Sequence, residues 1–226
     1  MDQMLQNMRG KAPLLIDACQ AIGHSLLNVV QALGAITLFS LQALRHCLTP
    51  PIFIRHIFRQ FIDIGYYSLP VVGMTALFTG MVLALQSYTG FSRFNAESAI
   101  ASVVVLSITR ELSPVLAGLM VAGRVGASIA AEIGTMRVTE QIDALTTLSV
   151  NPMKYLVVPR VVAGTLMLPA LVLIGDIIGV YGGYIVSTHV LGFSSGSYLH
   201  QTWEVMERID VVSGLVKAAA FGFLVT

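Results

Sequence analysis

Hydrophobic residues in this sequence gather into long stretches that are separated by short polar segments. Three stretches reach the length of about 20 apolar residues that a helix needs to cross the hydrocarbon core of a bilayer. They cover residues 64–86, 98–123 and 161–188, and charged residues interrupt only the second and third. A fourth stretch begins near Val211 and is still apolar at Thr226, so we expect the chain to stop inside its last span. The pattern predicts an all-α integral membrane protein with several transmembrane helices.

The stretch 25–44 is apolar and uncharged, but polar residues interrupt it. Ser25, Asn28 and Gln31 recur every three residues, which gathers them towards one side of a helix. Basic residues flank the stretch on both sides, whereas a crossing usually shows a charge asymmetry. These features favour an amphipathic helix in the membrane interface over a transmembrane crossing. We therefore expect an N-terminal cytoplasmic or interfacial region, residues 1–60, followed by a transmembrane domain, residues 61–226.

The distribution of Lys and Arg predicts the orientation of the spans. With the N-terminus in the cytoplasm, nine basic residues fall on the cytoplasmic side: Arg9, Lys11, Arg45, Arg55, Arg59, Arg124, Arg137, Lys154 and Arg160. Two, Arg93 and Arg208, fall outside. Because positive charge accumulates on the cytoplasmic side of membrane proteins, this orientation is favoured. Residues 87–97 and 191–210 are then the external loops.

Composition supports the membrane assignment and excludes several functions. The 226 residues are 55% hydrophobic and 11% charged, whereas soluble domains carry about 25% charged residues. A net charge of +1 without a Lys/Arg cluster argues against a nucleic-acid partner. The two cysteines and five histidines show no metal-binding or redox spacing. The sequence also lacks a phosphate loop, a nucleophile elbow and a zinc-protease motif, so we expect neither a catalytic site nor nucleotide hydrolysis in this chain.

Two adjacent charges, Arg110 and Glu111, interrupt the second stretch near the expected bilayer midplane. Charges at this depth are costly and normally face a bundle interior or a wet cavity. Neighbouring side chains on a helix point about 100° apart, so each charge needs a partner of its own. Pro114 removes an amide donor and allows a local kink. We interpret these residues as part of a path for polar lipid head groups; the alternative is a buried ion network that fixes helix packing.

Residues 127–148 combine apolar positions at helical spacing with acidic ones. Met136 is one of the apolar positions, and Glu132, Arg137, Glu140 and Asp143 are the polar positions among them. A short amphipathic helix on the cytoplasmic side suits docking into a groove of a soluble partner. The alternative is an interfacial helix that rests on lipid, which acidic residues beside anionic head groups disfavour.

Gly175, Gly179 and Gly183 form a small-residue stripe on the third stretch. Glycines at i, i+4 and i+8 lie on one face of a helix, where they let another helix approach closely. The alternative is that glycine is simply common in membrane helices. We expect close helix packing at this stripe.

Four ungapped runs carry a family resemblance. They are residues 110–116 (RELSPVL), 122–126 (AGRVG), 131–145 (AEIGTMRVTEQIDAL) and 151–152 (NP), and residues 80–86 (GMVLALQ) agree with them. The sequence from about residue 64 onward resembles the MlaE (YrbE) family. These proteins are permease subunits of ABC systems that move phospholipid between the two membranes of Gram-negative bacteria.

The resemblance implies a homodimeric permease in the inner membrane with several partners. These would be cytoplasmic ABC ATPase subunits that hold ATP and Mg, a periplasmic MCE-domain lipid-binding protein and a small cytoplasmic STAS-type accessory subunit. It implies that Glu132, Met136, Arg137, Glu140 and Asp143 belong to a coupling helix seated in the ATPase. It places Arg110, Glu111 and Pro114, with Leu83 and Gln86 of the first span, along the lipid path. The family plan has five spans, so we expect this chain to be C-terminally incomplete.

We therefore expect a transport subunit that maintains the lipid asymmetry of the outer membrane and carries no cofactor of its own. An alternative is an ion-coupled secondary transporter that uses the carboxylates of Asp176 and Glu111 as proton sites. The absence of inverted repeats weighs against it. A membrane enzyme with His189 or Asp176 in its site is a third interpretation, but the sequence offers no nucleophile–base set.

Overall fold

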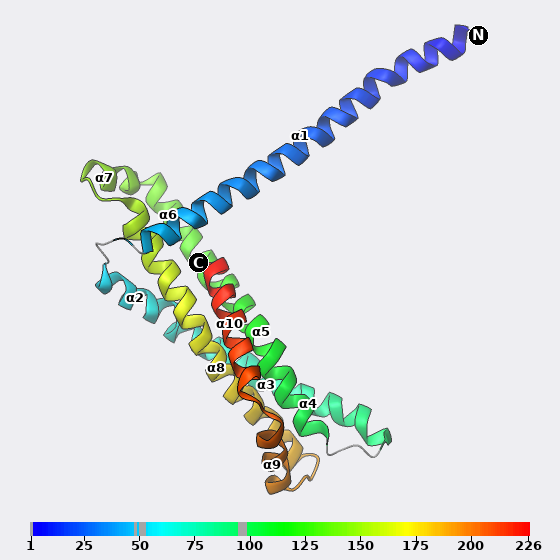
Figure 1. Ribbon diagram of the computed structural model, residues 1–226, viewed down its shortest axis with the longest axis vertical. Helices are drawn as coiled ribbons and strands as arrows, with labels where there is room; N and C mark the ends of the chain where they lie inside the picture. Colours follow the sequence, from blue (N-terminus) through cyan, green and yellow to red (C-terminus); the bar gives the residue numbers. More distant parts are fainter. Residues whose placement is uncertain (1, 48, 50–52, 95–98) are drawn as a thin grey trace. The chain divides into compact units, whose positions relative to one another are not determined.

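The computed structural model describes residues 2–47, 49, 53–94 and 99–226, and nearly all of them are helical (Figure 1). No strand occurs in these ranges, and four helical segments among them are long and apolar enough to cross a membrane. The expected all-α membrane fold is therefore confirmed. The chain divides into two compact units, Met1–Thr49 and Pro50–Thr226. The division precedes the boundary expected between residues 60 and 61.

The first unit consists of one long helix, α1 (Asp2–Cys47). Apolar side chains are exposed on several sides of it, including Leu27, Leu33 and Leu38. The segment Gly23–Cys47 has the length and hydropathy of a crossing. The interfacial placement of residues 25–44 therefore stays a prediction.

The second unit begins with α2 (Ile54–Ile64), which is amphipathic and packs against α8. A short 3₁₀ turn, Tyr66–Ser68, then separates α2 from α3 (Leu69–Phe91). The first span thus begins later than residue 64. Gly65 at the bend lies so close to Met167 and to the carbonyl of Phe61 that no Cβ fits there.

The second span is longer than expected, because one helical segment runs without interruption from Ile100 to Val138. It contains α4 (Ile100–Ser107), α5 (Ser113–Val121) and α6 (Ala127–Val138). Two π-helical turns, Ile108–Leu112 and Ala122–Gly126, join them. A π turn widens the helix by one residue per turn and tolerates the missing amide of a following proline, here Pro114. The segment therefore continues well past residue 123.

Helix α7 (Gln141–Thr147) and a π turn, Met153–Val157, lead into α8 (Val158–His189). Helices α9 (Ser195–Val205) and α10 (Arg208–Val225) follow. The predicted loop 191–210 thus contains a helix, whereas residues 95–97 of the other predicted loop lie outside the described residues. Within this unit α8 contacts α2, α3, α5, α9 and α10, while α6–α7 and α9 lie at opposite ends (Figure 1).

Glycines line the closest approach between α3, α4 and α8. A Cβ on Gly80 of α3 would overlap the backbone of Gly179 of α8. A Cβ on Gly179 would lie 3.2 Å from the carbonyl oxygen of Ala76, and one on Gly183 would lie 2.7 Å from the side chain of Val104. Gly175 faces Ser113 of α5 in the same way. The small-residue stripe therefore lies along the packed face of α8.

Candidate functional site

Arg110 lies in the π turn between α4 and α5 and forms an ion pair with α10. Its Nε donates to Oδ1 of Asp210 at 2.5 Å, and a terminal guanidinium nitrogen contacts the same oxygen. Only 1% of the Asp210 side chain is exposed. The other carboxylate oxygen of Asp210 accepts from the amide of Glu207 at 3.1 Å and so caps α10. The pair ties the π turn to the start of α10.

Glu111 forms a second ion pair with the same helix. Lys217 Nζ donates to Oε1 of Glu111 at 2.7 Å and to the backbone oxygen of Arg110 at 3.0 Å. The side chains of Glu111 and Lys217 are 68% and 41% exposed on the surface of this chain. Neighbouring opposite charges on the π turn thus each have a separate partner on α10. One pair is anchored on a buried carboxylate and the other is accessible from outside.

Asp210 and Lys217 are site residues that the sequence analysis missed. We expected Asp210 in an external loop and left Lys217 without a role. Their spacing of seven residues places them on one face of a helix, two turns apart. The last apolar stretch thus carries an acid and a base on one helical face, and the second stretch carries the adjacent opposite charges Arg110 and Glu111. This match in charge is the signal that could have identified Asp210 and Lys217.

Pro114 stands beside these pairs, whereas two other predicted path residues do not. Pro114 is buried near Gly214 of α10, which lies too close to the carbonyl of Thr109 to admit a Cβ. Leu83 packs against the apolar cluster around Ile100. Gln86 is exposed and lines an open cavity of about 650 Å³ near Arg93 at the end of α3. Within one chain, Leu83 and Gln86 do not share a site with Arg110.

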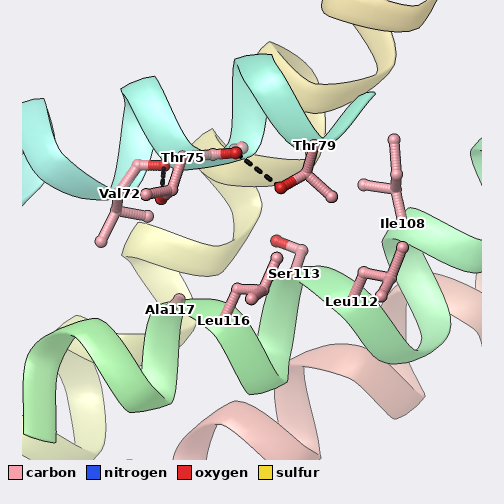
Figure 2. Close-up of a pocket in the computed structure, with 9 residues that line it drawn as sticks. Val72, Thr75, Thr79, Ile108, Leu112, Ser113, Leu116 and Ala117 are labelled. Carbon is pink, nitrogen blue, oxygen red and sulfur yellow. Dashed lines mark hydrogen bonds between the residues drawn. The ribbon is translucent and has the colours of Figure 1, made fainter. Parts of the chain in front are cut away.

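A small seam between α3 and α5 holds three hydroxyl side chains (Figure 2). Its free volume is about 10 Å³, which is room for about one water molecule. Thr75 donates to the carbonyl oxygens of Val71 and Val72, Thr79 donates to that of Thr75, and Ser113 donates to that of Val172. Because neighbouring carbonyls already satisfy these hydroxyls, the seam is a packed contact and not a ligand site.

The predicted single amphipathic helix over residues 127–148 is wrong. Helix α6 ends at Val138, and Glu140 adopts a left-handed backbone with φ of 57° before α7 begins. The bend is closed by the amide of Thr139, which donates to the carbonyl of Thr135 at 3.0 Å. Arg137 and Asp143 form an exposed ion pair across it at 3.6 Å. The segment is a corner of two helices with Val138 and Leu148 exposed.

Glu132 ties α6 to the start of α8. Its Oε2 lies 2.8 Å from a terminal nitrogen of Arg160, which is buried and also donates to the carbonyl of Leu156 at 3.2 Å. Met136 and Tyr155 line a cavity of about 180 Å³ next to this pair. From the sequence we expected Arg160 only as a cytoplasmic charge. Arg160 directly follows Pro159 at the beginning of a span, and this position could have indicated that it forms an ion pair with another helix.

No group of three or more His, Cys, Asp or Glu side chains in the described part of the chain could hold a metal ion.

Comparison with known proteins identifies the family. The family described as "Permease MlaE" matches residues 57–226. A "Probable ABC transporter permease protein" of Rickettsia bellii is 59% identical over 213 residues, which cover 94% of this chain and 82% of the relative. The "Intermembrane phospholipid transport system permease protein MlaE" of Haemophilus influenzae is 34% identical over 221 residues, with the same shares covered. "Protein TRIGALACTOSYLDIACYLGLYCEROL 1, chloroplastic" of Arabidopsis thaliana is 36% identical over 172 residues, 76% of this chain and 49% of the relative.

The family match spans the ion-paired π turn, the α6–α7 corner and the glycine-packed helices. The chain therefore belongs to the MlaE permease family.

Proposed function

We propose that this chain is the membrane-spanning permease subunit of an ABC transporter that moves phospholipid between the inner and outer membranes of a Gram-negative bacterium. In this role it maintains the lipid asymmetry of the outer membrane. The observation that carries the proposal is the continuous segment Ile100–Val138, which bears the Arg110–Glu111 charges in its first third and ends in the exposed α6–α7 corner. A displacement at the corner can reach the charged turn through this one segment, because its two π turns can change register.

The α6–α7 corner is the proposed docking site for a cytoplasmic ABC ATPase, which holds ATP and Mg. It offers an exposed apolar residue on each side of the bend and the carboxylates of Glu140 and Asp143 between them. A soluble partner can bury the apolar side chains and pair with the acids. The N-terminus and this corner then lie in the cytoplasm, in agreement with the Lys/Arg census.

The accessible Glu111–Lys217 pair is the proposed contact for the lipid head group. Lys217 offers an ammonium to a phosphate, and Glu111 can accept from an amine of the lipid. Arg110 and Pro114 hold this turn against α10, while Leu83 and Gln86 on α3 belong to a separate part of the path. A homodimer, a periplasmic MCE-domain protein and a STAS-type subunit complete the proposed assembly.

Ion-coupled transport through Asp176 and Glu111 finds less support. Glu111 is paired with Lys217, whereas Asp176 lines a different cavity beside α9. The two carboxylates do not form one relay within the chain.

Substitution of Glu140 tests the proposed docking. Glu140→Lys reverses the charge. Lysine and glutamate have a similar free-energy cost in the left-handed backbone conformation, so we expect normal folding. We expect the ATPase to be lost during affinity purification from native membranes. Glu204→Lys on α9, at the opposite end of the unit, is the matched control and should retain the ATPase. Undiminished co-purification with Glu140→Lys would contradict the docking assignment.

A further inference from the structure

A large cavity lies between α8, α9 and the beginning of α10, and its lining includes Thr109 and Val211, the sequence neighbours of Arg110 and Asp210. Its volume is about 520 Å³, and Val105 and Thr109 close it on the side of α4. Most of its wall is apolar, from side chains such as Leu173, Ile177 and Leu199. A cavity of this size and character suits a ligand with hydrocarbon chains.

One charged side chain, Asp176, lines this cavity. It is 7% exposed, and one of its carboxylate oxygens is enclosed by protein atoms without a hydrogen-bond partner among the described residues. None of the described residues that line the cavity is Lys or Arg. A carboxylate buried in a membrane protein is costly unless a cation or a donor compensates it. The Ser113 hydroxyl lies within hydrogen-bonding reach of Asp176, but none of the described lining residues supplies a cation.

Aromatic side chains also line this cavity. Tyr181 stacks on Tyr184 at 6.2 Å between ring centres, and Tyr184 meets Tyr198 edge to face at 5.9 Å. Trp203 of α9 adds a fourth ring to the lining. Aromatic faces attract cations, and an aromatic wall next to a carboxylate is an arrangement that binds ammonium groups.

We propose that the α8–α9 cavity binds a phospholipid that carries a primary ammonium head group, with Asp176 as the partner of the ammonium and the aromatic rings beside it. The carboxylate would pair with the ammonium group of the ligand, and the apolar wall would contact its acyl chains. This inference rests on the proposed lipid transport and names a lipid class for it. A small soluble amine would leave the apolar wall uncovered, so the lipid is favoured.

Tryptophan fluorescence gives a direct readout, because Trp203 is the one tryptophan of the 226 residues and lines the cavity. The purified chain in an uncharged detergent is titrated with dihexanoyl phosphatidylethanolamine, its N-acetylated form, dihexanoyl phosphatidylglycerol and free phosphoethanolamine. We expect phosphatidylethanolamine to bind about tenfold more tightly than the other three, which is the worth of one charge-assisted hydrogen bond. The N-acetylated lipid removes the charge without altering the protein.

Two variants complete the test. Asp176→Asn keeps the shape of the side chain and should reduce phosphatidylethanolamine binding to the level of phosphatidylglycerol binding. It should leave phosphatidylglycerol binding unchanged. Glu204→Gln, an exposed acid of α9 outside the cavity lining, should preserve the preference. Equal binding of the charged and N-acetylated lipids, binding of free phosphoethanolamine as tight as that of the lipid, or no binding at all would overturn the proposal. Failure of the proposed function would appear differently, as an absence of ATP-dependent lipid transport by the intact complex.

Discussion

The two ion pairs on α10 differ in burial, and this difference decides what each can do. Asp210 is almost fully buried and is paired with Arg110, so loss of that partner would leave a buried carboxylate without a cation. Glu111 and Lys217 remain accessible from outside the chain, so a ligand can replace the ion pair between them. We therefore assign a structural role to Arg110–Asp210 and a ligand-facing role to Glu111–Lys217. This division refines the expectation that Arg110 and Glu111 both belong to the lipid path.

Removal of one partner should separate these roles. Arg110→Met leaves the buried Asp210 carboxylate unpaired and should lower the free energy of unfolding by about 3 kcal/mol. Lys217→Met breaks an accessible pair and should cost less than about 1 kcal/mol, while it weakens lipid binding. Unfolding of the purified chain in detergent measures both. Equal losses of stability would contradict the division, and partial recovery in the Arg110→Met, Asp210→Leu double variant would support it.

The close glycine contact between α3 and α8 should make the protein sensitive to one added methyl group. Gly80→Ala places a Cβ against the backbone of Gly179, which cannot move aside as a side chain does, so we expect a loss of about 2 kcal/mol or more. Gly90→Ala lies on the same helix with no atom near its Cβ and should be neutral or stabilise by up to about 1 kcal/mol. Thermal unfolding of both variants measures the contrast. Similar stability for the two would mean that α3 and α8 do not approach this closely.

At the scale of elements, α2 is the clearest amphipathic helix of the second unit. Ile54, Phe58 and Ile62 form an exposed apolar stripe, while Arg59 and Asp63 lie on the polar side next to a cavity. An amphipathic helix of this kind lies in the membrane interface with its apolar face towards the acyl chains. We therefore propose that α2, which packs on α8, lies in the membrane interface.

Spin labels on α2 test this placement. Labels at positions 54, 58 and 62 should be relaxed mainly by oxygen, which concentrates in the hydrocarbon. Labels at positions 55 and 59 should be relaxed mainly by a water-soluble nickel chelate. Accessibility of both faces to the nickel chelate would place α2 in water instead.

Hydropathy and spacing predicted the helical class and the existence of the spans, because a bilayer demands about 20 apolar residues wherever a helix crosses it. They did not predict the turn at Gly65, which packs against Met167, a residue about 100 positions away in the sequence. They also did not predict that Asp210 partners Arg110, since a contact between residues 100 positions apart leaves no local periodicity. The break at Glu140 escaped for a further reason: glutamate rarely adopts a left-handed backbone.

At the scale of the second unit, its two ends carry different chemistry. The α6–α7 corner lies at one end and α9 at the other (Figure 1). The corner carries the exposed acids Glu140 and Asp143, and the aromatic cavity lies beside α9. The segment Ile100–Val138 runs between them and contains two π turns, where the register of a helix can change at low cost. We infer that a partner at the corner acts on the charged turn through this segment.

Lipid transport by the reconstituted complex tests this account most directly. The permease and its co-purified partners are placed in liposomes that contain a fluorescent phospholipid, and transfer of the lipid to acceptor liposomes is followed with ATP and Mg or with a pH gradient alone. We predict transfer only with ATP and Mg, and its loss in Glu140→Lys while lipid binding persists. Transfer driven by the pH gradient without the ATPase, and abolished by Asp176→Asn, would contradict the account and favour ion-coupled transport.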